Sequence, residues 1–105
     1  MASAFVSCGV VGTKALLGYI PPVLNSQPNV SQLLTTSAAN AVSTVTAPQA
    51  GAIWTIAAIG GAVYAVFGAD PNAATETGAR HYIPSGLIRD FAAVAVGEKV
   101  ALVDA

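Results

Sequence analysis

The sequence contains few side chains that could do covalent or acid–base chemistry, and their spacing assembles no known site. The single histidine, His81, stands between Arg80 and Tyr82 at the expected start of a strand. A catalytic base needs a nucleophile and an orienting partner beside it, and no motif around His81 supplies either. We therefore interpret it as an ordinary strand or surface histidine. Cys8 is the only cysteine, so an internal disulfide is excluded, and we expect its small apolar side chain in the core.

The acidic residues and glycines show no ligand-binding spacing either. Asp70, Glu76 and Asp90 are separated by intervals that match no known calcium loop. The Gly-Thr-Lys of residues 12–14 lacks the preceding glycine of a phosphate-binding loop. Glu98 is expected at the solvated tip of the last turn. The sequence therefore predicts no catalytic residue, no metal site and no cofactor, and the protein is not expected to be an enzyme.

Charge is scarce and unevenly distributed along the chain. Four Lys and Arg and five Asp and Glu among 105 residues give a net charge of −1, so no basic field is present that would hold nucleic acid. Residues 15–69 contain no Asp, Glu, Lys, Arg or His. A soluble monomer usually spreads charge over its whole surface. We therefore expect the uncharged half to be covered by a partner subunit, a neighbouring protein or a lipid bilayer.

Short apolar runs punctuated by Gly, Pro and Asn predict an all-β fold. No helical period is sustained over three turns, whereas strand-forming runs recur along the chain. We predict a small antiparallel β-sandwich or barrel in residues 31–105, preceded by an extended N-terminal arm in residues 1–30. Residues 68–78 are expected to form an exposed loop. The predicted strands are residues 4–8, 31–38, 41–46, 52–59, 62–67, 80–83, 87–92 and 99–103.

Residues 52–67 are predicted to form a central hairpin. The adjacent glycines at positions 60–61 suit a two-residue turn, which would pair Trp54 with Phe67 across the two strands. A membrane-spanning helix over residues 51–69 is the alternative, because these nineteen residues carry no charge. The paired glycines and the lack of flanking Lys or Arg favour the hairpin. Its predicted core residues are Trp54, Ile56, Val63 and Phe67.

The order of motifs in the second half of the chain resembles that of a known family. Thr44-Val45-Thr46-Ala47-Pro48 stands before the predicted hairpin, and Val66-Phe67-Gly68 stands at its end. The sequence then continues with Asp70-Pro71, Ile83-Pro84-Ser85-Gly86, Asp90-Phe91 and Gly97-Glu98-Lys99-Val100-Ala101. This order, over roughly residues 42–103, is similar to that of small β-sandwich virion proteins of tailed bacteriophages, encoded among head and tail genes. The shared elements are turns and strand ends rather than catalytic residues.

The resemblance implies a structural virion subunit on the capsid surface. The expected function is that of a head decoration, or cement, protein, which joins neighbouring major capsid proteins and is commonly a homotrimer. Such a protein would need no nucleic acid, membrane or cofactor. The alternatives are a neck, tail or fibre module that binds a glycan and, from another class, a small holin-like membrane protein. Partner contacts are expected in the N-terminal segment, at Lys14, Leu17, Tyr19, Ile20, Val23 and Leu24.

Overall fold

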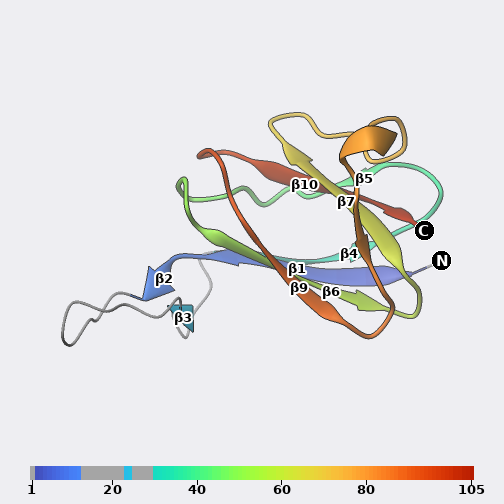
Figure 1. The fold of residues 1–105 in the computed structure, drawn as a ribbon, viewed down its shortest axis with the longest axis horizontal. Helices are drawn as coiled ribbons and strands as arrows, with labels where there is room; N and C mark the ends of the chain where they lie inside the picture. Colours follow the sequence, from blue (N-terminus) through green and yellow to red (C-terminus); the bar gives the residue numbers. More distant parts are fainter. Residues whose placement is uncertain (1, 13–22, 25–29) are drawn as a thin grey trace.

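Alternating apolar and polar residues build two β-sheets that pack face to face. The computed structural model describes residues 2–12, 23–24 and 30–105, and these form two four-stranded antiparallel sheets and a two-stranded one (Figure 1). Sheet I consists, in spatial order, of β4 (Val30–Thr35), β1 (Ser3–Gly9), β6 (Ile53–Ile59) and β9 (Ile88–Ala92). Sheet II consists of β5 (Ala41–Val42), β10 (Lys99–Asp104), β7 (Val63–Gly68) and β8 (His81–Ile83). The predicted antiparallel β-sandwich is thereby confirmed.

Two short elements complete the described part of the chain. Strands β2 (Val11–Gly12) and β3 (Val23–Leu24) pair with each other in the two-stranded sheet. A single turn of 3-10 helix, η1 (Thr77–Ala79), lies before β8. No helix in the described residues is long and apolar enough to cross a membrane.

The core lies between sheets I and II and takes every second residue of their strands. In β1, Ala4, Val6 and Cys8 are buried, whereas Phe5 between them is exposed. The period of two follows from strand geometry, since successive side chains point to opposite faces. The expected core residues Trp54, Ile56 and Val63 are fully buried, and Phe67 is half-buried against them.

The predicted hairpin is wrong, because its two strands lie in different sheets. β6 pairs with β1 and β9, and β7 pairs with β10 and β8. Gly60, with φ 75°, lies in the connection that takes the chain from one sheet to the other. The rings of Trp54 and Phe67 nevertheless meet across the core, with centroids 6.0 Å apart. Alternation fixes which face of a strand is buried but not which strand lies beside it.

The same crossing occurs between the predicted strands of residues 31–38 and 41–46, which a turn at residues 39–40 connects. This turn joins β4 in sheet I to β5 in sheet II, so these strands do not pair with each other. β5 is also shorter than expected, because it ends at Val42. Residues 51–69, the alternative membrane helix, contain strands β6 and β7, so the helical interpretation of this segment is wrong.

The boundary expected between residues 30 and 31 is also wrong. β1 lies between β4 and β6 inside sheet I, with six residues paired to β4 and seven to β6. The sandwich therefore begins at the N-terminal strand, which was expected as a strand but assigned to the arm. Among the expected partner contacts, Val23 and Leu24 form β3. Lys14, Leu17, Tyr19 and Ile20 lie outside the described residues.

The loop of residues 69–80 covers the outer face of sheet II and is more than the exposed loop that we expected. Ala73 is fully buried and forms a second apolar cluster with Val66, Ala101 and Val103, which point away from the main core. Asn40 holds the loop in place: its Oδ1 accepts the Ala73 N–H at 2.9 Å, and its Nδ2 donates to the Pro71 carbonyl at 3.2 Å. Figure 1 shows this loop over β7 and β10.

Candidate interaction surfaces

A buried carboxylate, Glu98, organises one end of the sandwich. Its Oε1 accepts the indole N–H of Trp54 at 3.0 Å, and its Oε2 accepts the backbone N–H of Val94 at 3.1 Å. Only 6% of the residue is exposed, so the expected solvated tip is wrong. Hydrogen bonds to a charged acceptor are stronger than neutral ones. Glu98 thus ties the strand that follows it to both the core and the preceding loop.

The loop of residues 93–98, which the Glu98 carboxylate anchors, exposes apolar side chains. Val94 is 83% exposed and Val96 is 71% exposed; we call residues 94–96 the apolar tip. Backbone hydrogen bonds link the loop to Ala47, which donates to the Glu98 carbonyl at 2.8 Å and accepts from the Gly97 N–H at 2.9 Å. Gly97 has φ 82°, a conformation that favours glycine. The tip is therefore a fixed apolar projection.

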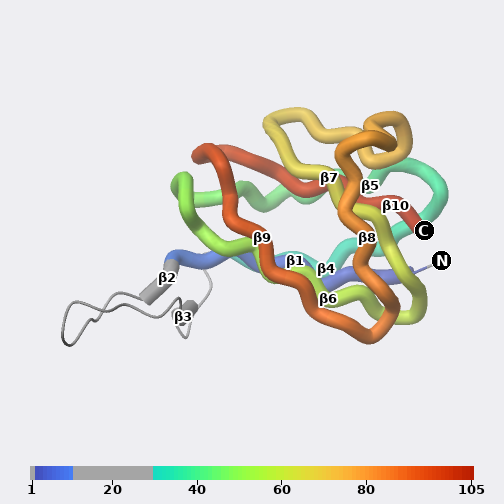
Figure 2. The backbone as a smooth tube through the Cα atoms, in the orientation of Figure 1, coloured from blue at the N-terminus to red at the C-terminus, as the bar shows by residue number. Residues whose placement is uncertain are grey.

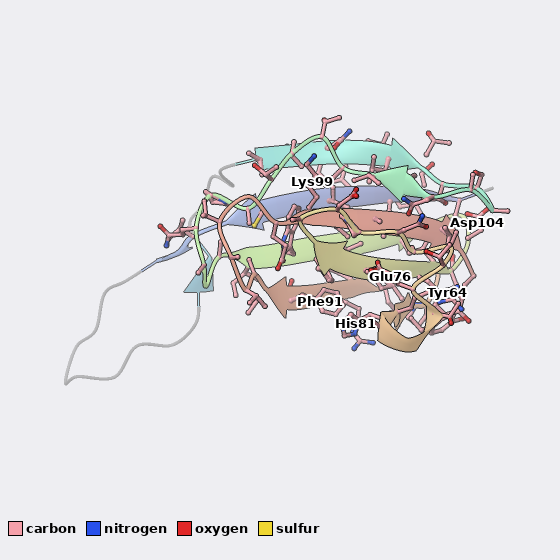
Figure 3. All side chains as sticks on the ribbon, turned by 90° about the horizontal axis from the view of Figure 1, so that it is seen from above. Tyr64, Glu76, His81, Phe91, Lys99 and Asp104 are labelled. Carbon is pink, nitrogen blue, oxygen red and sulfur yellow. The ribbon has the colours of Figure 1, made fainter. Side chains whose placement is uncertain are left out.

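An open groove lies between the apolar tip and the edge of the two sheets. It measures about 470 Å³ and is lined by Phe67 and Phe91 together with the exposed His81. The His81 and Phe91 rings are 4.7 Å apart, and Phe67 and Phe91 are 5.0 Å apart. Figure 3 shows His81 and Phe91 side by side at this edge. The groove offers ring faces and edges to a ligand, with the Asp90 position on its wall.

The outer face of sheet I carries an exposed apolar row. Strand register places Leu33 beside Phe5, Phe5 beside Ala57, and Ala57 beside Ile88, so the row crosses all four strands. Leu33 is 58% exposed, Phe5 49% and Ile88 65%. We call the outward side of sheet I face I. The next row on face I consists of Ser31, Ser7, Thr55 and Asp90.

The residues considered for chemistry are not brought together. Cys8 is buried in the core, and burial, followed by the charge of Glu98, raises the pKa of its thiol to about 11. Such a thiol is largely unreactive at neutral pH. Asp70 and Glu76 lie in the covering loop and Asp90 on face I. In the part of the chain that the structure describes, no group of three His, Cys, Asp or Glu side chains could hold a metal ion.

The burial of Glu98 has a signal in the sequence, although we expected this residue at a solvated tip. Val100 and Leu102 are buried core residues of β10, and Glu98 stands two residues before Val100. Because side chains two residues apart point to the same face of a strand, alternation places the Glu98 side chain on the inward side with Val100 and Leu102. The apolar row of face I has no comparable signal, because Phe5, Leu33 and Ile88 come from separate segments and only strand order brings them together.

Comparison of the chain with protein-family models, with curated proteins and with solved structures gives no match.

Proposed function

We propose that this protein is a non-enzymatic head decoration, or cement, subunit of a tailed bacteriophage, and that its apolar tip contacts the major capsid protein. The observation that carries the proposal is the fixed presentation of Val94 and Val96 by the buried Glu98 carboxylate. The motif order of residues 42–103 supplies the identity of the assembly. The fold is of the kind that the resemblance implies.

The tip has the properties of a small, repeated contact. Association costs less when the binding loop is already ordered, because less conformational entropy is lost. Each tip offers only a few apolar side chains, so one contact is weak. A subunit that binds a shell at many equivalent positions gains from multivalency where neighbouring contacts are linked. Removal of exposed valines from water would supply the driving force.

Binding to heads that lack the subunit tests this function. Purified protein is mixed with such heads, and occupancy is measured by co-sedimentation and by cryo-electron microscopy. Val94→Asp and Val96→Asp place a charge in the contact and are expected to weaken binding by about tenfold or more. Thr75→Asp, at another exposed position, on the covering loop, is the matched control and should bind as the wild type does. Failure of the wild type to bind, or equal occupancy for all variants, would overturn the proposal.

The groove favours a second candidate, a neck, tail or fibre module that binds a glycan. Sugar rings stack on aromatic side chains through their apolar faces, and Phe91 with His81 provides such a surface beside Asp90. Trp54, the largest aromatic, is fully buried and unavailable. Titration with host-envelope oligosaccharides tests this candidate by chemical shift changes. Shifts at the groove that disappear in Phe91→Ala support it, and unshifted groove signals contradict it.

A further inference from the structure

We propose that face I is a self-association surface, on which a second copy of this chain packs about a two-fold axis parallel to the strands. This surface is separate from the apolar tip, so the inference goes beyond shell binding and does not depend on it. The two sheets differ in how their outer faces are covered. Sheet II covers its outer apolar residues with the loop of residues 69–80, whereas face I leaves Phe5, Leu33 and Ile88 exposed.

The low charge of face I allows the same face of a second chain to pack on it. Among the outward positions of its four strands, Asp90 is the only charged residue. Like charges that face each other across an interface repel and weaken association, and two largely uncharged faces avoid that repulsion. Flat sheet faces also pack well on each other, with mean strand directions within about 30°.

The two-fold axis follows from the order of residues in the apolar row. An axis parallel to the strands reverses strand order in the second copy, so that β1 faces β6 and β4 faces β9. The large Phe5 then lies opposite the small Ala57 of the other copy, and Leu33 lies opposite Ile88. The two central pairs of the row thus set a large side chain against a small one, which lets the two layers interdigitate there, while Leu33 and Ile88 contact each other at its ends.

The same axis separates the two carboxylates. In the second row, Asp90 of each copy faces Ser31 of the other, and Ser7 faces Thr55. A serine hydroxyl can donate a hydrogen bond to a carboxylate. An axis perpendicular to the strands at the level of the apolar row would instead place Phe5 on Phe5. The parallel axis therefore satisfies both packing and charge.

The symmetry of this contact makes it a closed dimer. A two-fold contact uses the same patch on both chains, whereas a three-fold ring joins two different patches head to tail. The row on face I is complementary to itself and so favours the two-fold. We therefore expect a dimer where the family resemblance alone implies a trimer.

Sedimentation velocity on the full chain is the first test. The wild type should sediment with twice the chain mass of 10.4 kDa. Phe5→Asp should reduce this to the mass of one chain, because it places a carboxylate against Ala57 of the other copy. Val94→Asp adds the same charge on the apolar tip and should remain a dimer. A monomeric wild type, or a trimer that persists in Phe5→Asp, would overturn the inference.

Cross-linking then tests the axis itself. In one chain, β4 and β9 are three strand spacings apart, so residues 33 and 88 are separated by about 14 Å. A bis-maleimide shorter than that distance cannot join them within a chain. The double variant Leu33→Cys, Ile88→Cys should therefore give a covalent dimer, and each single variant should not. Cys8 is buried and should remain unmodified. A single variant that cross-links as well as the double one, or a double variant that does not, contradicts the axis.

The outcomes for face I and for the tip are distinguishable. If the protein is a dimer but fails to bind heads, the inference about face I stands and the proposed function is wrong. If the protein is a monomer that binds heads through Val94 and Val96, the proposed function stands and the inference about face I is wrong.

Discussion

The outer faces of the two sheets differ in what covers them. On sheet II, Val66 and Val103 are buried beneath the loop of residues 69–80, with Ala73 inserted among them. On sheet I, Phe5 and Leu33 occupy outward positions of similar chemistry and remain about half exposed. One sandwich therefore contains an apolar sheet face that it covers itself and another that it leaves open.

This difference divides the apolar surface of the two sheets into a part that the fold covers and a part that it leaves open. The covering loop is fixed by polar contacts: Asn40 bonds to it from outside, and within it Asn72 N–H donates to Glu76 Oε2 at 2.8 Å. The Arg80 guanidinium lies 4.0 Å over the Tyr64 ring, and Figure 3 shows Tyr64 and Glu76 on this side of the molecule. Sheet I receives no such segment from the described residues, and large exposed apolar patches commonly mark interaction sites.

The largest expected effect is that of placing a charge on the covered face. Val66→Asp buries a carboxylate beneath Ala73 without a partner and should cost about 5 kcal/mol of unfolding free energy. Phe5→Asp places the same charge on the open face and should cost less than about 1 kcal/mol within the monomer. Urea unfolding at low protein concentration, followed by Trp54 fluorescence, measures both. Equal losses would show that the two faces do not differ in cover.

The contrast between the faces also marks what could be predicted from the sequence. Apolar runs and turn residues identified the eight strands of sheets I and II, but not β2 and β3. Alternation identified the inward side chains of Trp54, Ile56 and Val63, because side-chain direction in a strand is a local property. Which strands pair depends on contacts between distant segments, so the hairpin was wrong although its inward residues were correctly identified. The covering loop was expected from its turn residues. Its docking depended on Asn40, which lies more than thirty residues away from Ala73.

The candidate surfaces likewise depend partly on local sequence and partly on contacts between distant segments. Val94 and Val96 are visible in the sequence as apolar residues near a turn. Their exposure, and the hydrogen bond by which the Glu98 carboxylate accepts the Val94 N–H, are seen only in the structure. The expected contacts in the N-terminal segment rested on its lack of charge. The structure adds a second surface with little charge, face I, whose apolar row can be recognised only after strand order is known.

Loss of the shared core should affect both faces together. Trp54→Ala removes the buried ring that reaches Phe67 of sheet II and leaves Glu98 without its indole donor. We expect a loss of about 3–5 kcal/mol. Trp54→Phe keeps a ring but removes the N–H, and should cost about 1.5–3 kcal/mol. Thermal and urea unfolding check both, and near-neutral results would mean that Trp54 is not buried.

A smaller effect should follow from loosening the cover of sheet II. Arg80→Ala removes the guanidinium above Tyr64 and its hydrogen bond to the Ala73 carbonyl, which is 3.4 Å long. The expected loss is about 1 kcal/mol, with faster amide exchange in residues 69–80. Arg89→Ala, whose guanidinium lies 5.8 Å from the Phe91 ring on an exposed edge, is the control. If both variants exchange alike, Arg80 does not hold the loop.

The smallest effect concerns Asp104, which joins the two sheets at the end where residue 2 and the C-terminus lie close together (Figure 2). A hydrogen bond from the Thr36 hydroxyl lowers the pKa of the Asp104 carboxyl below its ordinary value of 3.8; desolvation opposes this, and the Ala2 N–H adds to it.

Because the pKa is lowered in the folded state, this stabilisation is fully present above the unfolded value. It is lost as the pH falls through the folded one. Asp104→Asn should therefore reduce the loss of stability between neutral pH and about pH 2–3, and Thr36→Val should act in the same direction by removing the donor. Thermal unfolding across this range measures the difference. Neither Thr36 nor Asp104 lies on face I or in the covering loop. A loss of dimer mass in either variant would therefore mean that face I depends on the contact of Asp104 with Thr36 and Ala2.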